Sequence, residues 1–581
     1  MFLKKMKNKK TGRTYLSIVH GYRDKVTKKT KVKTIESLGY LDALEKKYSD
    51  PIAFFEEKVK QMNQERAAEK FTMTFHIGRE ERIQEKTANR KNFGYAVLSQ
   101  IYHELGIHTF LKNRQRHTQE TYDANTIMKL LVFSRLLFPS SKKKTYTQRE
   151  RFFEKTNFSL DDLYRCLSFF NRHRAALQLW LHERIRQRYG RRDDLVYYDV
   201  TNYYFEIDAD DTLRKKGVSK EHRPNPMVQM GLFMDTDGIP ITYGLYPGNK
   251  LDKQTFIPML RTIQHNFSLH RIIVVADKGM TTGDNIWYTL SAKNGYILSY
   301  SVRGADRAFK NYVLDPDGYR PGRDGFKIKS RLYPREITVT AKSGKKIKKR
   351  VDEKQVIFYS EKYARKAQAE RAPALEKARR LIQNPSRYNR ATSSGAAKYV
   401  KHLTFDSKTG EIMKTRQTTL LFDEEKLKRE EQFDGYYAII TSEYQETDER
   451  IIQLYRGLWK IEENFKVTKS DLKTRPVYLS TQEHIASHFL ICFVSLVIAR
   501  LLERRLKGKY SIPTLIESLR KASCSHIKEN YYLFDYYDEV LADIGQAFGI
   551  DFGKKCLSLK EIKKILGEVK KAEITQQFCD K

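Results

Sequence analysis

TDERIIQLYRGLWKIEENFKVTKSDL, residues 447–472, has the periodicity of a single amphipathic helix. Apolar residues and one threonine recur on one face at heptad spacing: Ile451, Leu454, Leu458, Ile461, Phe465, Thr468 and Leu472. At 3.6 residues per turn such a stripe predicts a helix with one buried face. Thr447 is the predicted N-cap of this helix.

Polar and aromatic residues follow the edge of the same stripe. Tyr455, Glu462 and Lys469 are seven residues apart, so they fall in line along the predicted helix, with Trp459 and Lys466 between them. A carboxylate flanked by an aromatic ring and a lysine suits chemistry on an anionic substrate. The alternative is an ordinary half-buried helix edge, on which Glu462 pairs with Lys466 at i,i+4.

The composition favours a folded protein with a polyanionic partner. The 581 residues contain 109 Lys and Arg against 71 Asp and Glu, a net charge of +38, and 40% are hydrophobic. This length predicts several structural units. The charge favours nucleic acid or a membrane surface as partner. The alternative is a ribosome-like or merely soluble basic protein.

No segment predicts secretion or membrane insertion. The N-terminus MFLKKMKNKK lacks the apolar region of a signal peptide. The most apolar run, 489–499, is too short to span a bilayer, so it predicts a buried helix. Five scattered cysteines with no C-x-x-C pair indicate a reducing compartment, without disulfides or structural zinc.

The N-terminal third divides into two predicted segments. Residues 1–78 form a small basic β-rich module, with strand-like pieces at 14–22, 31–40 and 71–77. Its lysine-rich turns either bind the DNA backbone or keep a hairpin edge soluble. Residues 79–190 are predicted to be helical and DNA-binding. A helix-turn-helix variant is one interpretation, although no strong signature of that motif is present.

Residues 191–301 predict the first part of a mixed sheet. LVYYDVTNYYFEI (195–207) is a strand with Asp199 at its middle, Asp237-Gly238 marks a hairpin, and HRIIVVADKGM (270–280) is a buried strand that ends at Asp277. The expected order is strand, strand, strand, helix, strand, helix, strand. With a further helix that carries a third carboxylate, this order is typical of a ribonuclease-H-like fold.

The rest of the chain is predicted to interrupt and then complete that core. Residues 302–433 predict a β-rich insertion subdomain with one helix at 361–383. Residues 434–502 return to the core with the Glu462 helix, and 503–581 form a helical C-terminal region. The predicted fold class is therefore a multidomain α+β or α/β protein with a ribonuclease-H-like mixed-sheet core and helical N- and C-terminal regions.

Three carboxylates in this order suit metal-dependent phosphodiester chemistry. Such chemistry uses two divalent ions about 3.5–4 Å apart, and Mg²⁺ or Mn²⁺ is bound by carboxylate oxygens. Asp199, Asp277 and Glu462 are the predicted ligands and catalytic residues. The alternatives are a structural Asp199 and an Asp277 that only caps the next helix; Glu463 competes with Glu462 but points about 100° away.

These segments resemble the DDE transposases of bacterial insertion sequences. The similar branch has a third motif of Tyr, two residues, Arg, three residues, Glu, six residues and Lys. The corresponding residues here are Tyr455, Leu458, Glu462 and Lys469. Leu458 replaces the motif arginine, and Arg456 or Lys460 is the candidate substitute. YYDVTNYYFE (197–206) and VVADKGM (274–280) are similar to the first and second acid motifs.

The resemblance covers roughly 190–300 and 434–502, and it implies a cut-and-paste recombinase. Such an enzyme binds the terminal inverted repeats of its element, cleaves there with two metal ions per active site, and joins the freed 3′-hydroxyl to target DNA. Asp199 would bridge both ions, and Asp277 and Glu462 would each complete one. Tyr455, Arg456, Trp459, Lys466 and Lys469 are the expected DNA contacts, with simple packing as the alternative for Trp459.

The implied partners are double-stranded DNA, as transposon ends and target, and a second copy of the chain in a homodimer, in the bacterial cytoplasm at the nucleoid. Three other interpretations stay open: a structure-selective nuclease without strand transfer, a non-catalytic DNA-binding derivative, and a basic translation-associated factor. The resemblance leaves open the end sequence, the target preference, any hairpin intermediate, the dimer surface and the activity of this copy.

Overall fold

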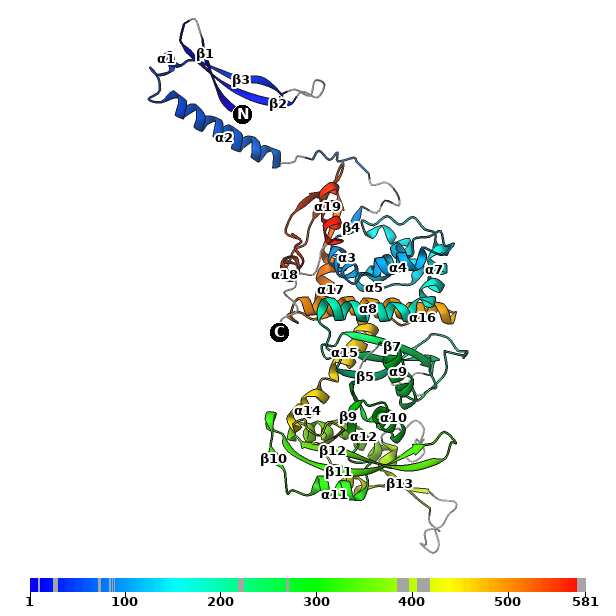
Figure 1. Ribbon diagram of the computed structural model, residues 1–581. Helices are drawn as coiled ribbons and strands as arrows, with labels where there is room; N and C mark the ends of the chain where they lie inside the picture. Colours follow the sequence, from blue (N-terminus) through cyan, green and yellow to red (C-terminus); the bar gives the residue numbers. More distant parts are fainter. Residues whose placement is uncertain are drawn as a thin grey trace. The chain divides into compact units, whose positions relative to one another are not determined.

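The computed structural model (Figure 1) divides into two compact units, Met1–Thr87 and Ala88–Lys581. The structure describes residues 1–8, 11–23, 30–71, 75–82, 85, 87, 89–217, 224–267, 271–383, 396–404 and 418–571.

The first unit is a three-stranded antiparallel sheet with a helix. Its elements are β1 (Phe2–Lys7), β2 (Thr14–Arg23), β3 (Thr30–Tyr40), α1 (Leu41–Leu44) and α2 (Pro51–Phe71), with strand order β1-β2-β3. The predicted strands at 14–22 and 31–40 are confirmed. The predicted strand at 71–77 is wrong, because Phe71 ends α2 and 75–77 form no strand; 72–74 lie outside the described residues. Residues 24–29 of the second lysine-rich turn also lie outside them.

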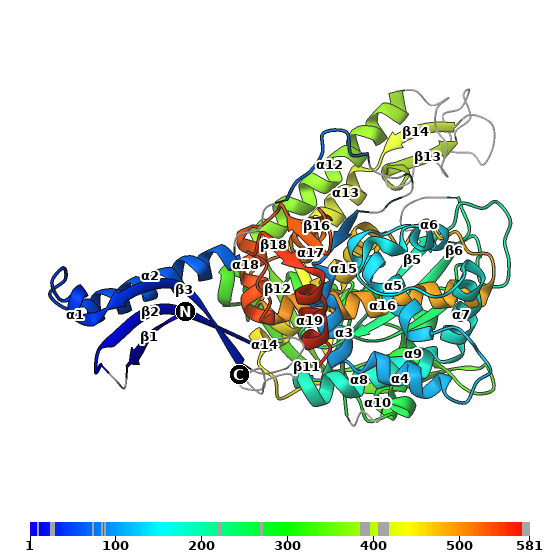
Figure 2. The same cartoon turned by 90° about the horizontal axis from the view of Figure 1, so that it is seen from above.

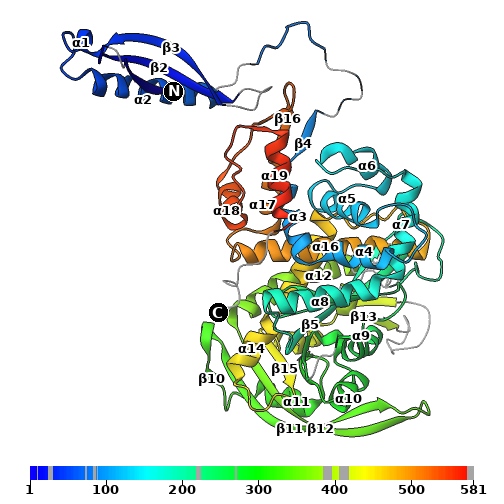
Figure 3. The same cartoon turned by 45° about the horizontal axis from the view of Figure 1, so that its top comes forward.

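The second unit begins with helices that pack on a long central helix. They are α3 (Tyr95–Glu104), α4 (Ile107–Gln115), α5 (Ala124–Leu137), α6 (Lys142–Thr147), α7 (Leu160–Arg172) and α8 (Arg174–Tyr189). The central helix is α16 (Gln482–Arg505). Together with α8 it lies between the other helices of this group and the large sheet (Figures 1 and 3). Within the described residues α16 alone is long and apolar enough to span a membrane, and its apolar window is entirely buried.

The large sheet has nine strands in the order β10-β11-β12-β15-β9-β8-β5-β6-β7. Its strands are β5 (Leu195–Tyr204), β6 (Met227–Met234), β7 (Pro240–Pro247), β8 (Ile273–Ala276), β9 (Gly295–Tyr300), β10 (Arg320–Pro321), β11 (Lys327–Thr340), β12 (Lys346–Tyr359) and β15 (Tyr436–Thr441). The chain enters α9 (Lys253–Asn266) after β7 and α10 (Gly283–Ser291) after β8. The predicted order of strands and helices over 191–301 is therefore confirmed, and the sheet is mixed, with β5, β8 and β9 parallel.

Strands of the predicted insertion extend this sheet instead of folding apart from it. β12 pairs with β15, with Val356 opposite Ile439, and β11 pairs with β12. Val356 and Ile357 face opposite sides of the sheet and both are buried, so the end of β12 is covered on both faces like a core strand. The insertion also contains α11 (Arg307–Leu314), α12 (Glu361–Gln383), β13 (Val400–Thr404), β14 (Thr418–Phe422) and α13 (Glu424–Glu431). Its predicted helix at 361–383 is confirmed as α12.

The C-terminal region is helical but also contributes to a second sheet. Its helices are α17 (Ile512–Lys521), α18 (Glu539–Phe548) and α19 (Leu559–Val569). Three short strands, β16 (Ser523–His526), β17 (Tyr531–Phe534) and β18 (Cys556–Ser558), pair in the order β18-β17-β16-β4 with β4 (Arg90–Asn92). Figure 2 shows these elements beside α3. The two ends of the second unit therefore share one sheet, which the sequence did not predict.

The helix predicted over 447–472 is interrupted, which corrects the prediction of one continuous helix. It consists of α14 (Asp448–Arg456), α15 (Trp459–Lys466) and a π-helical turn, Val467–Asp471. The interruption lies at Gly457, where Tyr197 of β5 donates a hydrogen bond from its Oη to the Leu454 carbonyl oxygen (3.0 Å). A Cβ at Gly457 would lie 2.0 Å from the Tyr197 hydroxyl oxygen, so only glycine admits this approach. The predicted N-cap is confirmed, because the Thr447 side chain accepts from the Arg450 amide.

Candidate active site

Asp199 and Asp277 directly follow the last paired residues of two adjacent parallel strands. In the β5–β8 register Tyr198 pairs with Ala276, so each aspartate follows at the next position on its strand. Neighbouring strands lie about 4.8 Å apart. Tyr198 and Ala276 pack in the core on one face of the sheet. Because side chains alternate along a strand, both half-buried aspartates belong to the opposite face.

The helix that carries Glu462 packs on that same face. Ile461 and Phe465 of α15 are buried in the core that contains Tyr197 and Val275, the strand residues two positions before the aspartates. Glu462 itself is exposed. The sheet therefore presents two aspartates toward the side on which the third predicted carboxylate lies.

Tyr455 lies between the second and third carboxylates. Its Oη donates to Asp277 Oδ1 (3.3 Å). Burial raises the pKa of the Tyr455 hydroxyl, and the negative charges of Asp277 and Glu462 raise it further. The hydroxyl is therefore protonated and available as a donor wherever both carboxylates are ionised.

The three carboxylates do not form a ready-made metal cluster. Among the residues that the structure describes, no three His, Cys, Asp or Glu side chains are grouped closely enough to hold one metal ion. The donor set is nevertheless all carboxylate, which suits Mg²⁺ or Mn²⁺, and two of its members are strand neighbours. The metal site predicted at Asp199, Asp277 and Glu462 stays a prediction.

Three of the structural alternatives for these residues are wrong. Asp277 occupies the position before the short 3₁₀ turn at 278–280, but its side chain makes no capping hydrogen bond there. Trp459 is 57% exposed, so it does not serve as core packing. The alternative Glu462–Lys466 ion pair is also not formed between these two described residues, both of which are exposed.

The β6–β7 turn (235–239) holds the opposite side of α15. Lys460 Nζ donates to the Thr236 carbonyl oxygen (2.6 Å), and Asn464 Nδ2 donates to that of Gly238 (2.9 Å). Lys460 and Asn464 precede and follow Glu462 by two residues, which places them on the other side of the helix. The turn therefore fixes α15 with Glu462 directed away from it.

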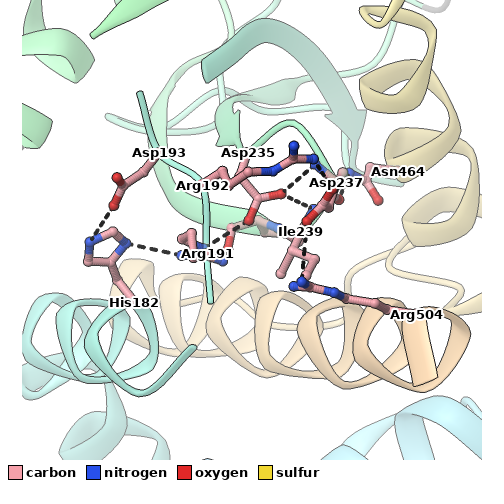
Figure 4. A network of polar contacts seen from close by, with 11 residues as sticks. His182, Arg191, Arg192, Asp193, Asp235, Asp237, Ile239, Asn464 and Arg504 are labelled. Atoms are coloured by element: carbon pink, nitrogen blue, oxygen red, sulfur yellow. Dashed lines mark hydrogen bonds and ion pairs between the residues drawn. The ribbon is translucent and has the colours of Figure 1, made fainter. Parts of the chain in front are cut away.

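A buried ion pair fixes the turn in its own right (Figure 4). Arg191 Nε donates to Asp235 Oδ2 (2.9 Å), and both side chains are buried. The other oxygen of Asp235 accepts from the amides of Asp237 (3.0 Å) and Ile239 (2.9 Å). A carboxylate shared in this way holds the turn in one conformation. Sequence analysis missed this group, although the Asp237-Gly238 hairpin signal lies beside it.

A neutral histidine completes the network of Figure 4. Arg191 Nη1 donates to His182 Nδ1 (3.1 Å), because arginine cannot accept. Burial, and then the charge of Arg191, lower the pKa of His182 to about 3. His182 therefore keeps its proton on Nε2, which lies 3.6 Å from Asp193 Oδ2, beyond hydrogen-bonding distance.

The remaining predicted DNA contacts lie on α14, α15 and the π-helical turn that follows them. Arg456 lies over the Phe326 ring (5.5 Å) and Lys469 over the Tyr203 ring (5.6 Å), while Lys466 is exposed. Leu458, at the position of the motif arginine, packs half-buried against the core. Lys460 holds the β6–β7 turn and Arg456 is exposed, and the substitute for the motif arginine stays a prediction.

Comparisons with known proteins agree with these motifs. A family model described as "Transposase DDE domain" matches residues 206–498, half of the chain, and one described as "IS1634 family transposase, N-terminal domain" matches 3–72. Asp277 and Glu462 lie inside the larger match, and Asp199 lies seven residues before its start. No curated protein matches the chain.

Two solved structures are similar at low identity. A piggyBac transposase synaptic complex with hairpin DNA is 8% identical, with a TM-score of 0.35 over 82% of this chain and 84% of that chain. A Mos1 transposase paired-end complex with the left transposon end is 14% identical, with a TM-score of 0.14 over 29% of this chain and 57% of that chain.

Proposed function

Because the chain belongs to the DDE-type transposases of insertion sequences, we propose that it binds the terminal inverted repeats of its element, cleaves there, and joins the 3′-hydroxyl ends to target DNA. The observation that supports this most is the placement of Asp199 and Asp277 side by side on the sheet face that α15 covers. Strands β5–β9 with α9, α10 and α15 would then form a ribonuclease-H-like core.

Asp199, Asp277 and Glu462 are the residues that would hold two divalent ions, Mg²⁺ or Mn²⁺. Such ions lower the pKa of the attacking water and neutralise charge on the leaving oxygen. The chain's own contribution is to direct the carboxylates. Tyr455 orients Asp277 through its hydrogen bond, and the β6–β7 turn holds the back of the Glu462 helix.

The exposed edge of the same helix would bind the DNA backbone. Lys466, Lys469 and Arg456 supply positive charge, and the exposed ring of Trp459 offers a surface for an unstacked base. The net charge of +38 favours such a partner. We further propose that the N-terminal unit and the helices of 79–190 bind the transposon ends, and that two copies of the chain act together as a homodimer.

The test is cleavage of DNA that carries the element's own ends, which are found as inverted repeats beside the coding sequence. Asp199→Asn and Glu462→Gln should each abolish Mg²⁺-dependent nicking and leave binding of the ends intact. Glu463→Gln is the matched control, because Glu463 pairs with Arg500 and is not a predicted ligand. Nicking that survives in Asp199→Asn would contradict the assignment.

Strand transfer separates a transposase from a nuclease on the same core. A pre-cleaved end with a free 3′-hydroxyl should be joined to target DNA by the unaltered protein and not by Asp277→Asn. Cleavage without any joining of the pre-cleaved end would favour the structure-selective nuclease instead.

A further inference from the structure

The second unit contains a cationic cavity outside the candidate active site. A cavity of about 500 Å³ is formed between the α5–α6 connection and the segment that follows the π-helical turn. Five of its lining residues are basic: Arg135, Lys142, Lys143, Lys473 and Arg475. None of its lining residues in the described part of the chain is an Asp or a Glu. A concave surface with this charge favours an anion.

Arg135 places a buried positive charge at this cavity without a carboxylate. Arg135 is 5% exposed. Its Nη atoms donate to the carbonyl oxygens of Leu472 (3.2 Å), Lys473 (3.1 Å) and Ser140 (3.1 Å). Its Nε is buried and has no hydrogen-bond partner among the described residues. A buried guanidinium satisfied only by neutral acceptors is costly, and a bound anion would lower that cost.

Lys142 adds a second buried basic group at the same cavity. It is 5% exposed, and its Nζ donates to His488 Nδ1 (3.3 Å). His488 Nε2 faces the Thr474 carbonyl oxygen (2.8 Å), which only accepts, so His488 donates there and is neutral. The Thr474 hydroxyl is buried without a partner among the described residues. These contacts leave the charge of Lys142 unpaired by any acid.

The mouth of the cavity has the surfaces that a nucleoside would use. Tyr478 is 69% exposed, Tyr164 is half-buried, and Pro139 and Pro476 also line the cavity. We propose that the cavity binds one nucleoside phosphate of a DNA strand, with the phosphate at Arg135, Lys142 and Lys473 and the base against Tyr478. This inference rests on the proposed function for the identity of the strand, and on the cavity for the phosphate.

The cavity lies within reach of a strand held at the carboxylates. Lys469 lies over the ring of Tyr203 (5.6 Å), and Arg475 lies over that of Tyr204 (5.1 Å). Tyr204 follows Asp199 on β5 by five residues, a distance of about 16 Å at the rise of a β-strand. A DNA strand cut at the carboxylates would therefore pass Lys469 and Arg475 and reach the cavity within a few nucleotides.

The test is binding of a fluorescent single-stranded oligonucleotide in EDTA, where no metal chemistry takes place. Lys143→Gln/Lys473→Gln removes two exposed cations of the cavity, and Lys560→Gln/Lys563→Gln removes two exposed cations of α19 as the matched control. The cavity variant should bind at least tenfold more weakly than the control variant. Its slope of log K against log salt should fall by about 0.7, the value for the loss of one phosphate contact on a single strand. Tyr478→Ala should weaken binding roughly tenfold through lost stacking.

Competition with free deoxyadenosine monophosphate distinguishes a DNA strand from a free nucleotide as the source of the bound phosphate. Weakened binding of the oligonucleotide supports a DNA strand as the ligand, and weakened binding of the mononucleotide alone supports a free nucleotide. If the cavity and control variants bind both probes equally and Tyr478→Ala has no effect, the inference is overturned. Asp199→Asn should keep the binding and lose cleavage, so a failure of the proposed chemistry stays distinguishable from a failure of the cavity.

Discussion

Gly457 lies directly against the hydroxyl of Tyr197. A Cβ at position 457 would stand 2.0 Å from that oxygen and 2.7 Å from the ring carbon that bears it. The same hydroxyl donates to the carbonyl oxygen of Leu454. The strand that carries Asp199 is thereby joined to the point where the chain passes from the Tyr455 helix to the Glu462 helix.

Gly457→Ala should therefore damage stability and activity together. The added methyl group must displace Tyr197 or α15, at a cost of about 1–3 kcal/mol of unfolding free energy. Cleavage should fall more steeply than binding of the transposon ends, because Glu462 moves with α15. Denaturant unfolding and cleavage assays measure the two effects. Tyr197→Phe should restore part of the loss in the double variant by removing the nearest atom, whereas additive losses would contradict this account.

Tyr455→Phe removes the hydroxyl that orients Asp277 and keeps the ring. A hydrogen bond to a charged acceptor is worth about 1.5–3 kcal/mol, so single-turnover cleavage should fall roughly tenfold or more. The unfolding free energy should fall by no more than that amount, because the half-buried ring stays in place. An unchanged cleavage rate would remove Tyr455 from the site.

Asp235→Asn should destabilise the protein strongly. It leaves the buried Arg191 guanidinium without its partner, at a cost of about 3–5 kcal/mol. Asp237→Asn is the matched control. Asp237 pairs with Arg192, whose side chain is 68% exposed, and at 3.6 Å with Arg504, whose side chain is 31% exposed, so the cost should be about 1 kcal/mol or less. Urea unfolding of both variants checks the difference, and equal losses would contradict the role given to the buried pair.

Lys142 should make stability depend on pH. Burial, and then the charge of Arg135, lower its pKa from 10.5 to about 7, against a small opposing effect of Cys492; its other neighbour, His488, is neutral. The unfolded chain therefore binds more protons between about pH 7 and pH 10.5, and stability contributed at this site rises with pH there by about 1.4 kcal/mol per unit. Below about pH 7 the penalty is present in full.

Lys142→Met should abolish that dependence and be more stable than the unaltered protein at about pH 7, with the difference shrinking toward pH 10. Denaturant unfolding of both proteins over this range is the measurement. A difference that stays constant with pH would show that Lys142 does not titrate in the folded protein.

The local elements and the candidate carboxylates could be predicted from the order of residues alone. The strands that contain Asp199 and precede Asp277, the Asp237-Gly238 hairpin, the N-cap at Thr447 and the helix at 361–383 follow from alternation, turn chemistry and helical periodicity. These signals act between residues close in the chain, so they survive without knowledge of the fold.

How those elements meet became visible only in the folded chain. Pairing of β12 with β15 joined the predicted insertion to the core sheet, and the contact of Tyr197 divided the predicted helix at Gly457. The pair Arg191–Asp235 and the contacts of Arg135 with the carbonyls of 472 and 473 link residues far apart in the chain. No local pattern encodes such partners, because burial and steric fit select them once the chain has packed.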